Sequence, residues 1–112
     1  MDFNAFKNEV KTIAFEQVRL DTDTYLEAVI LNKHMAALSA LLDKFLGVPI
    51  YPSPPDLPQQ VQDAIKSYGG IGQGQMLYLK ADGQDAIFAM LWPWQDKVRT
   101  TLKLVYKPLW RE

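Results

Sequence analysis

The stretch Ala86-Ile87-Phe88-Ala89-Met90-Leu91-Trp92 decides the fold of this chain. Its seven apolar residues are too few to span a bilayer, and turn residues bound it, Asp82-Gly83 before and Pro93 after. Such a bounded apolar run predicts a strand. Alternation along a strand gives it two apolar faces, Ile87, Ala89 and Leu91 on one and Phe88, Met90 and Trp92 on the other. A strand of this kind needs cover on both faces.

Two further strands are predicted around this one. Residues 75–80 precede it, and the Ala81-Asp82-Gly83-Gln84 turn is typical of a β-hairpin. After Pro93, a third strand is predicted from about Lys97 to Lys107, because apolar and polar residues alternate along it. The sequence therefore predicts a three-stranded antiparallel meander with residues 86–92 in its centre and the third strand on its outside.

The first 68 residues are predicted to be helical. Apolar spacing indicates a first helix over residues 3–20, and Thr24 with Glu27 resembles a capping box that starts a second helix. This helix is expected to end at Leu46, before Gly47 and a proline-rich connection, and a short third helix is expected over residues 57–68. The expected fold class is α+β: two long helices and one short helix, followed by the three-stranded meander.

The length predicts a single domain over residues 1–112, with a helical part at about 2–68, a glycine-rich loop at 69–75 and the meander at about 75–107. The chain has no cysteine, a net charge of −1, no apolar run long enough for a membrane helix, and no signal-peptide pattern at its start. We therefore expect a soluble cytoplasmic protein with no membrane association. Nucleic acid is disfavoured as a partner because basic residues are not in excess.

No catalytic signature, cofactor motif or metal-ligand spacing occurs in the sequence. The single histidine, His34, has no carboxylate at a spacing that makes a dyad or a metal site, and it is expected in a helix core or interface. We accordingly expect no catalytic residues, no metal and no cofactor, and lean towards a protein that is not an enzyme.

The aromatic residues near the central strand are the best candidates for binding. If helices cover only one face of the sheet, several large side chains lie exposed on the other face, and such patches are usually interfaces. The candidates are Tyr78, Phe88, Met90, Trp92 and Trp94. The alternative is that the third helix, the proline-rich connection or the C-terminal tail covers this face within the chain.

Two other groups of residues complete the candidates. The loop glycines Gly69, Gly70, Gly72 and Gly74 allow positive φ or a close approach of backbone, and Arg99, Lys103 and Lys107 form a basic row on one face of the third strand. The favoured function is a protein interaction module that forms a homodimer through the apolar sheet face or the second helix. The alternative is a ligand-binding or enzymatic pocket beneath the glycine-rich loop, lined by Tyr68, Tyr78, Trp92 and Trp94.

Overall fold

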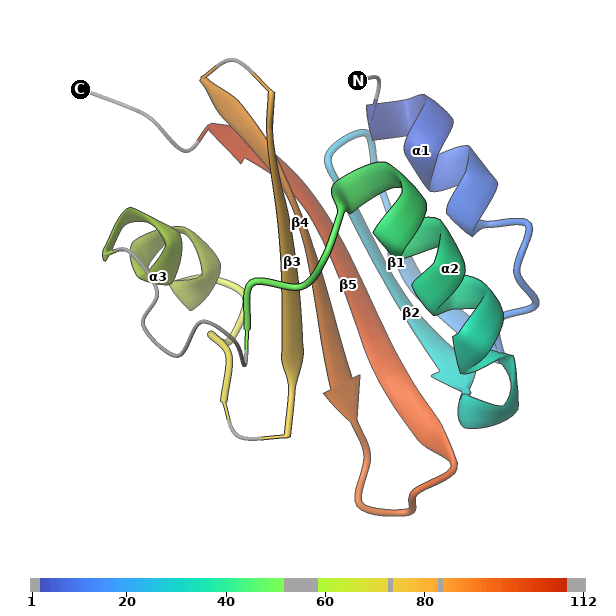
Figure 1. The fold of residues 1–112 in the computed structure, drawn as a ribbon. Helices are drawn as coiled ribbons and strands as arrows, with labels where there is room; N and C mark the ends of the chain where they lie inside the picture. Colours follow the sequence, from blue (N-terminus) through green and yellow to red (C-terminus); the bar gives the residue numbers. More distant parts are fainter. Residues whose placement is uncertain (1–2, 52–58, 73, 83, 109–112) are drawn as a thin grey trace.

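The sheet of this protein has five strands rather than three. A computed structural model describes residues 3–51, 59–72, 74–82 and 84–108. All neighbouring strands in it are antiparallel, and their order is β1-β2-β5-β4-β3 (Figure 1). The strands are β1 (Gln17–Asp21), β2 (Tyr25–Leu31), β3 (Met76–Asp82), β4 (Asp85–Pro93) and β5 (Arg99–Pro108).

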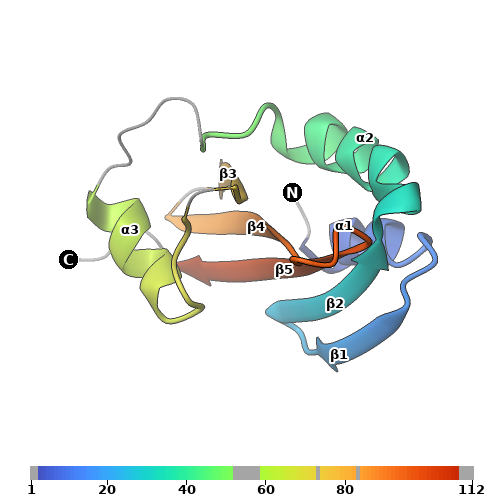
Figure 2. The ribbon, with the colours of Figure 1, turned by 90° about the horizontal axis from the view of Figure 1, so that it is seen from below.

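Helices lie on both sides of this sheet. The helices are α1 (Phe3–Val10), the 3₁₀ turn η1 (Asn32–His34), α2 (Met35–Leu46) and α3 (Gln59–Lys66). The core beneath α1 and α2 includes Phe6, Leu42 and Leu104, whereas α3 packs on a second core around Phe88. Figure 2 shows α2 over one side of the sheet and α3 apart from it, beside the ends of β4 and β5. The result is a compact α+β fold with a radius of gyration of 13.2 Å.

The expectation of two long helices followed by a three-stranded meander is wrong. Residues 17–31, expected to continue the first helix and begin the second, form the β1–β2 hairpin. The aromatic and β-branched residues Tyr25, Val29 and Ile30 favour a strand. Thr22 and Thr24 belong to the turn: the Thr22 amide donates to the Tyr25 carbonyl at 2.8 Å. The capping-box pattern at Thr24 is therefore fortuitous.

The prediction of the second helix is correct only for the last part of its range. The chain becomes helical at Asn32 and α2 ends at Leu46, where Gly47 adopts a φ of +82° as expected of a helix end. His34 closes the 3₁₀ turn at the start of α2 and is half-buried there. The third helix is confirmed over Gln59–Lys66, and the proline-rich residues 52–58 lie outside the described part of the chain.

The strand that decides the fold is confirmed, and so is the hairpin before it. β4 includes all seven residues from Ala86 to Trp92, and it pairs with β3 along one edge and with β5 along the other. β5, however, is the middle strand of the sheet, not an outer one, because β2 pairs along its free side over seven residues. The N-terminal hairpin thus extends the predicted meander by two strands.

Candidate functional site

The second face of β4 is covered by the chain itself. Phe88 and Met90 are 1% and 0% exposed, and they pack with Val61 and Ile65 of α3. Leu77 and Val105 from the flanking strands complete this core. The cover that the apolar face needs is therefore supplied by the short third helix, the second of the two alternatives that the sequence left open.

Trp92 is the last residue of β4 on this covered face, and it packs against the glycine-rich loop. Gly69 has a φ of +101°, and a Cβ placed on it would lie 2.2 Å from Cη2 of Trp92. The glycine therefore serves both purposes expected of it, a positive φ and a close approach. The indole Nε1 of Trp92 is buried without a hydrogen-bond partner among the described residues.

The basic row on β5 attaches α3 to the sheet. Lys103 Nζ donates to the Tyr68 carbonyl at 2.9 Å, and Lys107 Nζ donates to the Ala64 carbonyl at 3.0 Å. Lysines are favourable near a helix C-terminus because the last carbonyls lack helical partners. Lys103 also lies 3.6 Å from the centre of the Trp92 ring, and burial lowers the pKa of its ammonium. Arg99 does not join them: it pairs with Glu16 and Asp96.

Tyr78 lies apart from the other aromatic candidates. It belongs to the core beneath α1 and α2, on the face of the sheet opposite Phe88, because its partner in β4 is Ala89. Its hydroxyl donates to Asp43 of α2 at 3.2 Å. Burial, and secondly the nearby carboxylate, raise the pKa of Tyr78 to about 12, so this hydroxyl remains protonated at neutral pH. The structure gives it a role in attaching α2.

Trp94 lies on a part of the second face that α3 does not cover. Its indole Nε1 donates to Thr101 Oγ1 at 2.8 Å. The guanidinium groups of Arg19 and Arg99 lie over its ring, 5.6 and 5.8 Å from the centre. The contribution of Arg19 was not foreseen because residues 3–20 were expected to be one helix. The apolar and polar alternation of Gln17 to Asp21 was the signal for a strand here.

The two edges of the sheet differ in their exposure. β3 is bordered by residues 50 and 51: the Ile50 amide donates to the Leu77 carbonyl at 2.8 Å, and the Leu77 amide to the Tyr51 carbonyl at 3.3 Å. β1 pairs only with β2 within the described ranges, and all five of its residues are exposed. Val18 and Leu20 are each 49% exposed. An edge strand with exposed apolar residues is a template for pairing with another chain.

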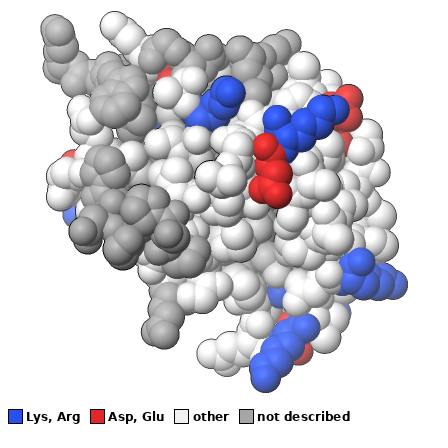
Figure 3. Space-filling view, viewed as in Figure 1, with Lys and Arg blue, Asp and Glu red and all other residues white. Residues whose placement is uncertain are grey.

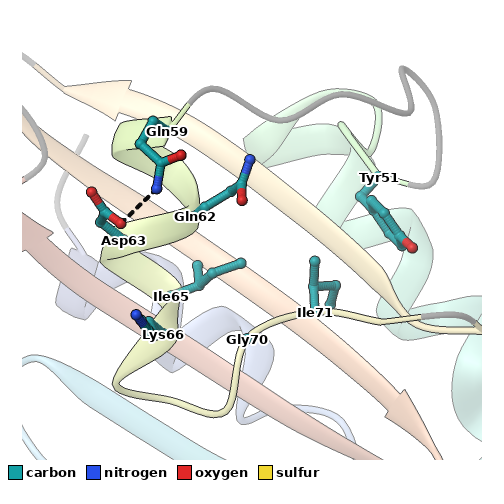
Figure 4. Close-up of a pocket in the computed structure, with 8 residues that line it drawn as sticks. All are labelled: Tyr51, Gln59, Gln62, Asp63, Ile65, Lys66, Gly70 and Ile71. Atoms are coloured by element: carbon teal, nitrogen blue, oxygen red, sulfur yellow. Dashed lines mark hydrogen bonds between the residues drawn. The ribbon is translucent and has the colours of Figure 1, made fainter.

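A hollow of about 390 Å³ lies beside the glycine-rich loop (Figure 4). Tyr51, Ile65, Gly70 and Ile71 supply its apolar and backbone walls, and the polar residues of α3 complete it: Gln59, Gln62, Asp63 and Lys66. The sequence suggested, as an alternative, a ligand pocket beneath this loop, but none of the four residues expected to line it lines this hollow. Of the four expected, Trp92 and Tyr68 belong to the core under α3, Tyr78 to the opposite face and Trp94 to the open part.

Charged side chains are dispersed over the face of the molecule that Figure 3 shows. In Figure 3 the described residues of this face show single or paired charges on a mostly uncharged surface. Among the described residues, no three His, Asp or Glu side chains gather as a metal site requires. No helix in the same ranges is long and apolar enough to cross a membrane.

Comparisons with known proteins add no assignment. No family model, curated protein or solved structure matches the chain.

Proposed function

We propose that this protein is a non-enzymatic interaction module that forms a homodimer through the β1 edge. One observation carries the proposal: within the described ranges β1 has a strand neighbour on one side only and all five of its residues are exposed, whereas the β3 edge is bordered by residues 50–51. The free N–H and C=O groups of an edge strand pair readily with a strand of another chain. Two copies of β1 side by side would make one continuous sheet of both subunits.

The interface lies next to the surface that the sequence indicated, but is not identical with it. Phe88 and Met90 are under α3, and the apolar residues Leu38, Leu42 and Leu46 of α2 are buried in the core of the same chain. Leu20 on the β1 edge and Trp94 beside it are accessible to a partner. Trp and Arg are the residue types most often found at the energetic centre of interfaces, and the Trp94–Arg19 contact supplies both.

A second copy is the partner that suits the charges around β1. Arg19 and Arg99 lie near Glu16, Glu27 and Asp96, so basic and acidic groups are mixed on this side. A strongly acidic or basic partner would meet like charges here, whereas a two-fold interface repeats the same surface and needs it to be self-complementary. An edge about 17 Å long favours a modest interface and an affinity in roughly the micromolar range. The proposal retains the expected cytoplasmic location.

Sedimentation equilibrium of the whole chain at about 5 to 200 μM tests this proposal, because it measures mass against concentration. We expect a mass that rises from 12.8 kDa towards twice that value. Leu20→Lys places a charge in the proposed interface and should keep the chain monomeric. Val48→Lys is the control, because Val48 is 78% exposed and lies between α2 and the residues that border β3, at the opposite edge of the sheet from β1. A monomer at every concentration, or a dimer that Leu20→Lys leaves intact, would contradict the proposal.

A further inference from the structure

The hollow beside the glycine-rich loop has walls that the backbone holds in place. The Gly70 amide donates to the Ile65 carbonyl at 3.0 Å, which joins the loop to the end of α3. The Gly72 amide donates to the side-chain oxygen of Gln75 at 2.6 Å. On the other side, the main chain of Tyr51 is bonded to Leu77 of β3. Walls fixed by such bonds make a preformed site, which is the usual state of small-molecule pockets.

The shape and lining of the hollow suit a flat ring. Figure 4 shows Ile65 extending from α3 towards Ile71, which rises from the loop, with the Tyr51 ring across the space. Ile71 and the Tyr51 ring offer dispersion and stacking contacts to a planar ligand, and Ile65, which is 2% exposed, adds a small apolar area. Gly70 leaves room, because no atom of the described residues lies within 4 Å of where its Cβ would be. A volume of about 390 Å³ is at the small end of the range for ligand sites, which suits a single ring system.

The polar groups of the hollow favour an uncharged ligand. Gln59 and Gln62 bring side-chain amides, a group that carries both donors and acceptors, and the Gln59 amide nitrogen donates to Asp63 Oδ1 at 2.9 Å (Figure 4). Asp63 and Lys66 carry opposite charges, so the described part of the lining has no net charge. The two lysines of β5 that reach α3 donate to its carbonyls instead, at Ala64 and Tyr68. An anion placed here would meet the Asp63 carboxylate without an excess of positive charge to offset it.

We infer that this hollow is a binding site for a small, uncharged aromatic ring that carries a carboxamide or a similar edge of donor and acceptor. The ring lies against Tyr51 between Ile65 and Ile71, and its polar edge faces the amides of α3. The site is at the β3 edge of the sheet, bordered by Tyr51, and is therefore separate from the β1 edge proposed for dimerisation.

Nicotinamide and nicotinate are the probes that test this inference, because they share one ring and differ in charge. Each is titrated into the full chain up to about 20 mM, and binding is followed by amide chemical shifts. We expect nicotinamide to bind saturably with a Kd in roughly the millimolar range, as for a small fragment, with shifts at Tyr51, Gly70 and Ile71. Nicotinate should bind at least about fivefold more weakly.

Variants place the probe in the hollow. Tyr51→Ala should weaken nicotinamide binding at least about fivefold, whereas Tyr51→Phe keeps the ring and should bind as the wild type does. If Tyr51→Ala does not fold, Ile71→Glu takes its place. A carboxylate inside the hollow should likewise weaken nicotinamide binding at least about fivefold. Leu20→Lys should bind normally, which separates this site from the dimer interface.

Each of three results with the wild-type chain would overturn the inference. They are the absence of saturable shifts, equal affinity for nicotinate and nicotinamide, and shifts confined to the second hollow of about 230 Å³, which Ser39, Gly74 and Met76 border. Unchanged binding by both Tyr51→Ala and Ile71→Glu would also overturn it.

Discussion

Trp92 and Gly69 are in direct contact, and the contact requires glycine. A Cβ on Gly69 would lie 2.2 Å from Cη2 and 2.9 Å from Cζ2 of the indole. Lys103 lies over the same ring and also holds the carbonyl of Tyr68, the residue before Gly69. One indole thus connects β4, β5 and the loop that follows α3. These contacts close the part of the second face that α3 covers.

Gly69→Ala should destabilise the protein more than Gly70→Ala. Both glycines have positive φ, +101° and +72°, so each alanine costs about 1–2 kcal/mol in backbone strain. Only the Gly69 variant also forces Trp92 to move, which adds about 1–3 kcal/mol. Urea denaturation measures both free energies of unfolding. Equal losses in the two variants would mean that the Trp92 contact is unimportant.

Phe88→Ala should cost about 3–5 kcal/mol of unfolding free energy, as expected for a buried phenylalanine. If Phe88 were instead exposed for binding a partner, its truncation to alanine would lower the unfolding free energy of the monomer only slightly. Leu20→Ala is the control, since Leu20 is 49% exposed, and it should change the stability by less than about 1 kcal/mol. Thermal and urea unfolding of both variants give the comparison. A loss below about 1 kcal/mol for Phe88→Ala would show that α3 does not cover this face in solution.

Lys103→Met should destabilise the attachment of α3 by about 1–3 kcal/mol. Methionine keeps an apolar stem but loses the hydrogen bond to the Tyr68 carbonyl and the cation over the Trp92 ring. Amide hydrogen exchange of residues 61–66 should become faster, because the helix end loses its partner. Lys80→Met, at an exposed position on β3, should leave these rates unchanged. Similar exchange rates in both variants would exclude this role for Lys103.

Asp21 connects β1 to α1, and its effect should depend on pH. Lys11 and Lys7 donate to its carboxylate, and these hydrogen bonds lower the pKa of Asp21 below its usual value. Because the folded pKa is lower than the unfolded one, the stabilisation is complete above about pH 4 and is lost as the pH falls through the folded pKa. Asp21→Asn should therefore be less stable than the wild type at about pH 7, with a smaller difference at about pH 2.

Urea denaturation at the two pH values measures this difference. Asp23→Asn is the control, because Asp23 is exposed in the same turn. An Asp21→Asn deficit that does not change with pH would contradict an electrostatic origin.

The C-terminal half of the fold was predictable from sequence because its signals are local. The apolar run Ala86–Trp92, the Asp82-Gly83 turn and the alternation of β5 each specify a strand or hairpin within a few residues. The N-terminal half was predicted wrongly because the apolar residues of 17–31 fit the spacing of a helix as well as that of a strand. Pairing of β2 with β5, about 75 residues later in the chain, decides in favour of the strand, and no local pattern reports that pairing.

The candidate sites were predictable only in part for the same reason. Gly69 and Trp92 were each identified, but their mutual contact depends on how α3 sits on the sheet. The row Arg99, Lys103 and Lys107 was expected as one basic face, yet two of its members bind carbonyls of α3 and the third binds two carboxylates. Arg19 and the β1 edge required the N-terminal hairpin, which the helical interpretation of residues 3–20 had excluded.

The pairing of β1 with its own copy is tested most directly by isotope-filtered NOE spectroscopy on an equal mixture of labelled and unlabelled chains. We expect intermolecular NOEs among residues 17–21 at concentrations where the dimer forms, and their loss in Leu20→Lys but not in Val48→Lys. Intermolecular NOEs confined to α2 or to another element, or none at concentrations of several hundred micromolar, would contradict it.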